Sequence, residues 1–235
     1  MHDYSDVLAQ SDRALHHVPF SDLAETDLAV GAVYEGGVRG HMGDEPISKL
    51  IPGVGNQGGV RGAGPVDARK LVVLFTTWHD VDWPDTVDPR TGRLTYFGDN
   101  KTPRKSLHES GLGGNLTFKV TFDRLHAVPG GRRGIPPFLL FARRPTEASA
   151  RAVQFLGLCA PGFPGVPESE DLVAIWKTSG HARFQNYRAT FTVLDAPVVS
   201  RGWIDDLSRG VSMTARTPAA WVEFVEQGTY RLIVR

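Results

Sequence analysis

The segment from Thr76 to Lys101 is dense in acidic and aromatic side chains. Its acids and its tryptophan and tyrosine rings are Asp80, Asp82, Asp85, Asp88, Asp99, Trp78, Trp83 and Tyr96. A base flipped out of a duplex needs flat side chains against its faces and hydrogen-bonding groups at its Watson–Crick edge. Cytosine presents an exocyclic amino donor there, which a carboxylate accepts well. One ring and one aspartate from this segment would meet both needs.

The same residues also fit simpler roles. Asp80, Asp82 and Asp85 follow a DxDxxD spacing that resembles a calcium loop, although the glycine and the trailing glutamate of such a loop are missing. Trp78 and Trp83 could belong to the hydrophobic core, and the acids could be solvated surface groups. The residues alone leave a base pocket, a calcium site and a plain surface loop open.

Three other stretches carry side chains suited to nucleic acid. A glycine-rich stretch would let the backbone approach DNA closely, and it holds Lys49 with the base-edge readers Asn56, Gln57 and Arg61. The run after the acidic segment supplies candidate phosphate contacts, namely Asn100, Lys101, Arg104 and Lys105. A third group surrounds the start of an expected strand and consists of Lys177, His181, Arg183, Gln185, Asn186 and Arg188. The first stretch could equally be a tight connection, and the third could brace a sheet.

Sequence signatures of common enzyme classes are missing. No GxGxxG follows an expected strand, and the P-loop, HExxH and GxSxG patterns are absent. A metal-dependent nuclease needs clustered acids, often with a lysine two residues beyond one of them. Pro84-Asp85 begins such a pattern, and no convincing continuation follows. The eight histidines are scattered, so we expect no catalytic residue, no metal and no cofactor in this chain.

Apolar runs of strand length, separated by glycine and proline, predict the elements that hold these residues. We expect strands at 28–34, 70–77, 93–97, 137–143, 153–158, 172–177 and 184–194. Helices are expected near 46–50, at 200–209, and from an N-cap at Thr217 to Gln227. Residues 115–125 fit either a strand or a helix capped by Asn115. Because strands and helices do not alternate, the expected class is α+β, with a curved, mostly antiparallel sheet and a few flanking helices.

The 26 basic and 26 acidic residues cancel, but they are unevenly distributed. Residues 1–30 hold six acids and one base, whereas residues 101–144 hold nine bases and two acids. A local basic patch, rather than the net charge, decides contact with phosphate. We therefore expect an acidic N-terminal tail over residues 1–20 and one domain over residues 21–235.

Several features bear on the compartment and the core. The chain has no apolar run of about 18 residues and no secretory signal pattern at its N-terminus. Its single cysteine excludes an internal disulfide. We expect a cytoplasmic, nucleoid-associated protein without membrane contact. Buried positions are expected for Cys159, Trp176, Trp203 and Trp221.

A set of sequence words covering most of the chain resembles the N-terminal recognition domain of AspBHI-type modification-dependent restriction endonucleases. The words are AVYEGG (32–37), DEPISKLIPGVGNQGG (44–59), LVVLFT (71–76), DVDWPD (80–85), TGRLTYFGDNK (91–101), LHES (107–110), RFQNYRATFTVLD (183–195) and RGWIDDL (201–207). Together, and in this order, they are far more specific than any single motif. The resemblance implies an SRA-like, barrel-like fold and a DNA-binding module that recognises 5-methylcytosine or a related modified cytosine by base flipping.

The resemblance also implies roles for residues of the acidic segment. Pockets of the SRA type have an aspartate-rich turn before a strand that carries a Thr-Tyr pair, and Thr95-Tyr96 match that pair. By this similarity Asp82 reads the cytosine edge, with Asp80 as the second choice. Trp83 and Tyr96 stack on the base or line its pocket.

Two positions depart from the family pattern, since Val60 stands where a phenylalanine is expected and Arg104 where a glycine is expected. These departures put the flanking-sequence preference in question. The family's full-length enzymes join this domain to a C-terminal nuclease. The implied partners are therefore double-stranded DNA containing modified cytosine and a nuclease domain or nuclease partner. A complete endonuclease with an unrecognised site and a calcium-binding β-domain are the alternatives.

Overall fold

Strand-length apolar runs form most of the strands that the sequence predicts. The computed structural model describes residues 16–103, 105–127, 130–179 and 181–233. The strands are β1 (His17–Val18), β2 (Leu28–Ala29), β3 (Val33–Tyr34), β4 (Val60–Ala63), β5 (Leu71–Thr76), β6 (Thr86–Val87), β7 (Arg93–Phe97), β8 (Phe138–Arg143), β9 (Val153–Pro161), β10 (Leu172–Ser179), β11 (Ala182–Val193) and β12 (Val198–Val199). The helices are α2 (Ile47–Leu50), α3 (Gly114–Leu125), α4 (Glu168–Asp171), α5 (Arg201–Ser208) and α6 (Ala219–Gln227), with short 3-10 turns η1 (Met42–Asp44), η2 (Val66–Ala68) and η3 (Gly131–Gly134).

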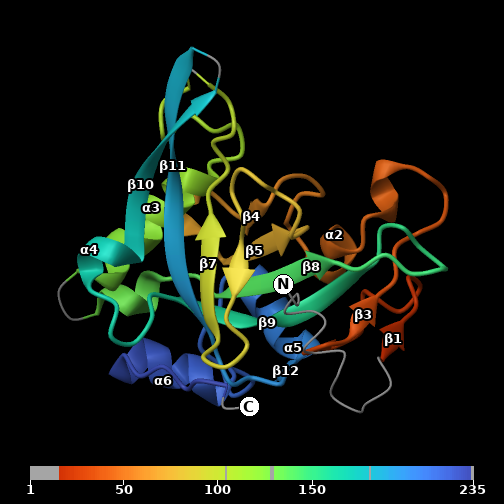
Figure 1. The fold of residues 1–235 in the computed structure, drawn as a ribbon. Coiled ribbons are helices and arrows are strands. Elements are labelled where there is room, and N and C mark those ends of the chain that lie inside the picture. The colour runs from red at the N-terminus through yellow and green to blue at the C-terminus, as the bar shows by residue number, and fades with distance from the viewer. Residues whose placement is uncertain (1–15, 104, 128–129, 180, 234–235) are drawn as a thin grey trace.

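Ten of these strands make one sheet with the order β4-β5-β8-β9-β11-β7-β6, to which β1, β3 and β10 are attached. Its pairs are antiparallel except for β5 with β8 and β1 with β3. The sheet is curved (Figure 1), so that the Tyr96 side chain of β7 reaches β5 and its hydroxyl donates to the Phe75 carbonyl at 2.8 Å. The expected α+β class with a curved, mostly antiparallel sheet is confirmed. The sheet is not closed into a barrel, because its end strands β4 and β6 do not pair with each other.

Helix α3 lies against the curled sheet and settles the ambiguity of residues 115–125. Phe118 and Phe122, one turn apart, each place their ring centroid 5.6 Å from that of Phe191 in β11. The expected cap at Asn115 is wrong, because the helix begins at Gly114 and its N-cap is Gly113, which has a left-handed backbone conformation. The Asp99 carboxylate caps the helix instead, accepting from the N–H groups of Gly114 and Asn115 at 2.9 and 3.0 Å.

The hydrophobic core confirms most of the expected burial. Trp203 of α5, Trp221 of α6 and Cys159 of β9 are buried. The prediction for Trp176 is wrong, since 54% of this side chain is exposed. Its strand β10 runs out with β11 as a long hairpin beyond the body of the molecule (Figure 1), where the Arg183 guanidinium lies over the ring.

Smaller differences concern element ends. The expected strand 28–34 is broken into β2 and β3 by a turn at Gly31, which has a φ of 89°. The last helix begins at Ala219 with Pro218, not Thr217, at its N-cap. Strand β1 lies inside the expected tail and pairs with β3, while the tail up to residue 15 lies outside the described residues, as does Arg104. Among the described helices, none has the length and apolarity needed to cross a membrane.

Candidate functional site: a cavity between β5 and β7

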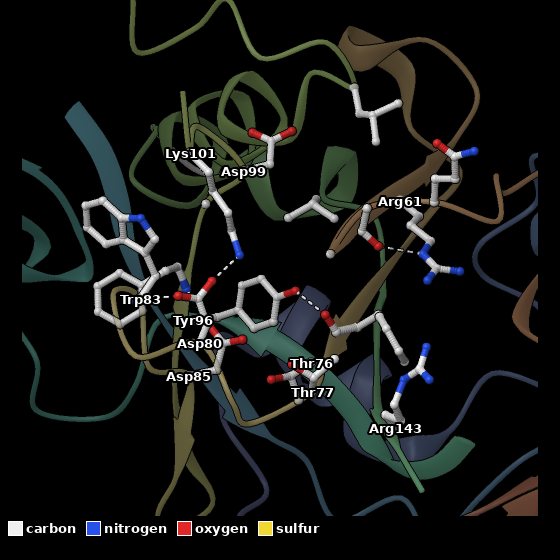
Figure 2. Close-up of a pocket in the computed structure, with 18 of the residues that line it drawn as sticks. Arg61, Thr76, Thr77, Asp80, Trp83, Asp85, Tyr96, Asp99, Lys101 and Arg143 are labelled. Atoms are coloured by element: carbon white, nitrogen blue, oxygen red, sulfur yellow. Dashed lines mark hydrogen bonds and ion pairs between the residues drawn. The ribbon is translucent and has the colours of Figure 1, made fainter. Parts of the chain in front are cut away.

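A cavity of about 560 Å³ opens where β5 and β7 approach each other without pairing. One wall is loop 56–59 and the start of β4, and another is the end of β5 with the acidic segment that follows it. The end of β7 and the residues around the β8–β9 connection complete it (Figure 2). The unclosed edge of the sheet therefore leaves a concave site between β5 and β7.

Tyr96 stands in the middle of this cavity (Figure 2). Its side chain is almost fully buried, and its ring meets Phe118 of α3 edge-on at a centroid distance of 6.1 Å. Burial raises the pKa of Tyr96 well above its ordinary range, so the phenol stays neutral and donates to Phe75. Gly59 lies against the hydroxyl, and a Cβ at this glycine would come within 2.8 Å of it. The Tyr96 ring is therefore held in place by Phe118 of α3, by the Phe75 carbonyl of β5 and by Gly59.

Trp83 forms an aromatic wall beside Tyr96. It is 5% exposed and packs on Phe97 and Phe184 with centroid distances of 5.5 and 6.1 Å. The ammonium of Lys177 lies 5.0 Å from its ring centroid. Both predicted aromatic residues thus line the cavity.

The turn at residues 80–83 separates its two aspartates. One oxygen of Asp80 accepts from the N–H groups of Asp82 and Trp83 at 3.1 and 3.0 Å, and the other pairs with Lys101. This turn keeps Asp80 in the cavity lining. The side chain of Asp82 is 71% exposed, pairs with Lys177 and does not line the cavity. Asp82, which the family resemblance assigned to the cytosine edge, therefore lies outside the cavity, whereas Asp80, the second choice, lines it.

Asp85, unlike Asp82, lines the cavity, and it accepts from the Phe97 N–H at 2.9 Å. Burial raises the pKa of Asp85 to about 7, against the opposing hydrogen bonds from Phe97 and from the Thr76 hydroxyl. For Asp80, burial acts upward, but the hydrogen bonds from Lys101, Trp83 and Asp82 leave its pKa lowered overall. The pKa values of these two neighbouring carboxyl groups are therefore shifted in opposite directions.

Trp78 lines the cavity with a strained backbone. Its φ of 62° is the only positive value at a non-glycine position in the described part of the chain. A bulky residue adopts this left-handed conformation at a cost of about 1–3 kcal/mol. The Thr76 hydroxyl accepts from its N–H at 3.1 Å, directly after β5. Such strain is concentrated at binding and active sites.

The three aspartates of the calcium-like pattern do not converge. Asp80 pairs with Lys101, Asp82 pairs with Lys177, and Asp85 accepts from the Phe97 N–H. Within the described residues, no group of three or more His, Cys, Asp or Glu side chains is placed to hold a metal ion. The geometry favours binding through hydrogen bonds and aromatic faces.

Four predicted DNA contacts line the cavity, and they are Asn56, Gln57, Arg61 and Lys101. Gln57 and Lys101 are exposed. Arg61 is 5% exposed, pairs with Glu45 at 2.6 Å and donates to the Gly58 carbonyl at 2.8 Å. Arg61 therefore holds the loop in place rather than presenting a free guanidinium to DNA.

Three predicted DNA contacts hold the fold together instead. Asn186 is fully buried and donates to the Gly98 carbonyl at 3.0 Å. Asn100 is 1% exposed and donates to the Gln185 carbonyl at 2.8 Å, which ties the loop after β7 to β11. Lys49 donates to the Phe20 carbonyl and covers the Phe20 ring. For these residues the structure supports the bracing role.

The remaining predicted contacts lie around the β10–β11 hairpin and the loop after β7. Lys105 and Arg183 are exposed, and the Arg183 guanidinium lies 4.7 Å from the Trp176 ring centroid. Gln185 and Arg188 are half-buried.

Sequence reasoning missed two arginines of the lining, Arg143 and Arg151. Arg143 is the last residue of β8 and is exposed, and Arg151 is half-buried two residues before β9. No motif marks them. For Arg143 the available signal was its position directly after the apolar run FLLFA, and for Arg151 the sequence offers none.

Comparison with known proteins points to one family. The family model described as "Restriction endonuclease AspBHI N-terminal" matches residues 28–235. The "DNA recognition domain of the cytosine modification-dependent restriction endonuclease LpnPI" is 41% identical, with a TM-score of 0.88 over 96% of this chain and 98% of that chain. The "DNA modification-dependent restriction endonuclease AspBHI" is 37% identical, with a TM-score of 0.84 over 93% and 99%.

A more distant structure shares the fold. It is "MspJI Restriction Endonuclease in Complex with 27-mer Oligonucleotide", with 19% identity and a TM-score of 0.60 over 99% of this chain and 57% of that chain. No curated protein gives a significant match.

Proposed function

The chain belongs to the restriction endonuclease AspBHI N-terminal family, and we propose that it reads modified cytosine in double-stranded DNA by taking the flipped base into the cavity between β5 and β7. The observation that carries this proposal is the pairing of a carboxyl, Asp85, with the ring of Tyr96 in one concave site. The name of the LpnPI relative, which describes a domain for DNA recognition in a cytosine modification-dependent enzyme, supports the same ligand. The chain supplies recognition, and strand cleavage belongs to a nuclease domain or partner.

Asp85 suits the Watson–Crick edge of cytosine. A protonated carboxyl has one donor and one acceptor oxygen, and cytosine offers the ring N3 as acceptor and the exocyclic amino group as donor. The pKa of about 7 keeps this form populated at neutral pH. Asp80, whose pKa is lowered, adds an ionised acceptor for the amino group. The two carboxyl groups together favour a base that donates from its exocyclic group.

The aromatic residues supply the energy that extrusion requires. Stacking on an aromatic side chain contributes about 1–3 kcal/mol per base, which offsets much of the few kcal/mol lost when a base leaves the duplex. Tyr96 and Trp83 are held rigidly by Phe75, Phe118 and Phe97. Because these rings are already ordered, little further side-chain entropy is lost on binding.

Binding to matched duplexes tests the proposal. Fluorescence anisotropy would compare duplexes that carry cytosine, 5-methylcytosine or 5-hydroxymethylcytosine at one position. We expect at least one modified duplex to bind about tenfold or more tightly than the unmodified one. A 2-aminopurine next to the modified base should gain fluorescence as the stack opens. Equal affinity for all three duplexes would overturn the proposal.

A further inference from the structure

We propose that the cavity binds a whole nucleotide rather than a base alone, with Arg143 and Arg151 holding the phosphate that flanks the flipped cytosine. This inference rests on the proposed function and deepens it. Figure 2 shows the charge pattern behind it: Asp80 and Asp85 lie on one side of the Tyr96 ring, and Arg143 lies on the other. The cavity is thus acidic at one end and basic at the other.

Arg143 and Arg151 lie at the two ends of the β8–β9 connection. Arg143 is the last residue of β8 and pairs in register with Val153, the first residue of β9. Arg151 lies in the turn two residues before Val153. All three residues line the cavity, so this one connection brings both guanidinium groups to it.

The other two cations of the cavity are neutralised. Arg61 pairs with Glu45, and Lys101 pairs with Asp80. Within the described part of the chain, no carboxylate lies at ion-pair distance from Arg143 or Arg151, and the Arg143 guanidinium donates to the Ala150 carbonyl at 3.1 Å. A guanidinium has five N–H donors, so most donors of these two arginines remain for a ligand.

A nucleotide matches this arrangement end to end. Its phosphate is anionic and accepts paired N–H bonds from arginine, while the amino group of cytosine donates to carboxylates. The opposite orientation would bring the phosphate against Asp80 and Asp85, where like charges repel. The charge pattern of the cavity therefore sets the orientation of the bound nucleotide, with its base toward Asp80 and Asp85 and its phosphate toward the two arginines.

A neutral phosphate analogue tests the inference directly. Duplexes with one methylphosphonate at either linkage flanking the 5-methylcytosine would be compared with a duplex carrying it four linkages away. For the unaltered protein we expect one flanking substitution to weaken binding about tenfold. In the double variant Arg143→Gln/Arg151→Gln the all-phosphate duplex should already bind about tenfold more weakly, and the flanking methylphosphonate should have no further effect.

Arg144→Gln is the matched control, because it removes the same charge at the neighbouring position outside the cavity lining. This variant should keep the methylphosphonate penalty. Thermal melting would check that all variants are folded. Indifference of the unaltered protein to both flanking methylphosphonates, or an unchanged penalty in the double variant, would overturn the inference. The preference for modified over unmodified duplex is measured separately with unsubstituted phosphates, so its loss would overturn the proposed function instead.

Discussion

The carboxylate side of the cavity comes from the loop that follows β5, whereas the arginine side comes from the β8–β9 connection later in the chain. Asp80 and Asp85 lie within that loop, and Arg143 and Arg151 lie at the two ends of the connection. The first side is partly buried and held by local hydrogen bonds. The second has an exposed and a half-buried guanidinium. This difference fits the proposed function, in which the loop after β5 reads the base and the two arginines hold the backbone phosphate.

Removal of the Asp85 carboxyl should have the largest effect on binding and tests whether the carboxylate side reads the base. Asp85→Ala should lower the preference for modified duplex by about 10–100-fold, since a well-made base-edge contact is worth about 1–3 kcal/mol of discrimination. The measurement is anisotropy with paired modified and unmodified duplexes. Asp82→Ala, on the same loop but outside the cavity, should leave the preference unchanged. The reverse result would restore the assignment made from sequence.

The two sides should also differ in their response to pH. Burial raises the pKa of Asp85 to about 7, above the ~3.9 of an unfolded chain. Between about pH 4 and pH 7 the native state keeps a proton that the unfolded state has lost, so the free energy of unfolding falls as pH rises through this window. Asp85→Asn removes this loss and should stabilise the protein at pH 8 by about 4 kcal/mol more than at pH 4, since each pKa unit corresponds to about 1.4 kcal/mol.

Urea denaturation of both proteins at the two pH values would measure this difference. The double variant at Arg143 and Arg151 serves as the control, because arginine does not titrate in this range. An equal stability change for Asp85→Asn at both pH values would contradict the raised pKa.

The hydrogen bond from the Tyr96 hydroxyl to Phe75 joins β7 to β5 between the carboxylate and arginine sides of the cavity. Removing it tests whether binding depends on how the two sides are held relative to each other. Tyr96→Phe keeps the ring and loses the bond to the Phe75 carbonyl, so it should cost about 1 kcal/mol of stability. Tyr230→Phe is the matched control, since its hydroxyl donates to the Pro161 carbonyl at 2.8 Å outside the cavity lining. Both variants should unfold at a lower temperature, but only Tyr96→Phe should weaken binding of modified DNA. If both variants lost the same affinity, the loss would come from reduced stability of the fold and not from the cavity.

The smallest expected effect on DNA binding comes from Lys105, which is exposed and lies outside the cavity lining. Lys105→Gln should weaken binding of modified and unmodified duplexes alike, by about threefold at moderate salt, and should lower the salt-dependence slope by about one. Lys49→Gln is the control, because its ammonium donates to the Phe20 carbonyl. A salt titration of affinity measures both. A change in the modified-to-unmodified ratio for Lys105→Gln would contradict the assignment to phosphate.

Sequence patterns predicted the parts of the site that local spacing determines. The strands around the acidic segment follow from the apolar runs, and the family resemblance selected Trp83, Tyr96 and Asp80, all of which line the cavity. The exposure of Asp82 could not be predicted, because it depends on a turn in which Asp80 accepts two backbone N–H groups.

Residues placed by long-range packing were harder to predict. Asn100 and Asn186 have the composition of base-edge readers, yet they join the loop after β7 to β11 across 86 positions of chain. Arg143 and Arg151 carry no motif, and they reach the cavity only because the β8–β9 connection folds against it. A polar residue in a recognition domain is therefore assigned to ligand or to fold only when its strand neighbours are known.

The glycines of the cavity have a consequence for anyone who wishes to retune the protein by directed evolution. A Cβ at Gly59 would press on the Tyr96 hydroxyl at 2.8 Å, and a Cβ at Gly98 would lie 1.7 Å from the Asn115 amide oxygen. Libraries that randomise these two positions would consist mostly of misfolded members. Gln57 and Thr77 line the same cavity and are exposed. Diversity placed there would vary the shape offered to a substituent on the base while the framework that holds Tyr96 stays intact.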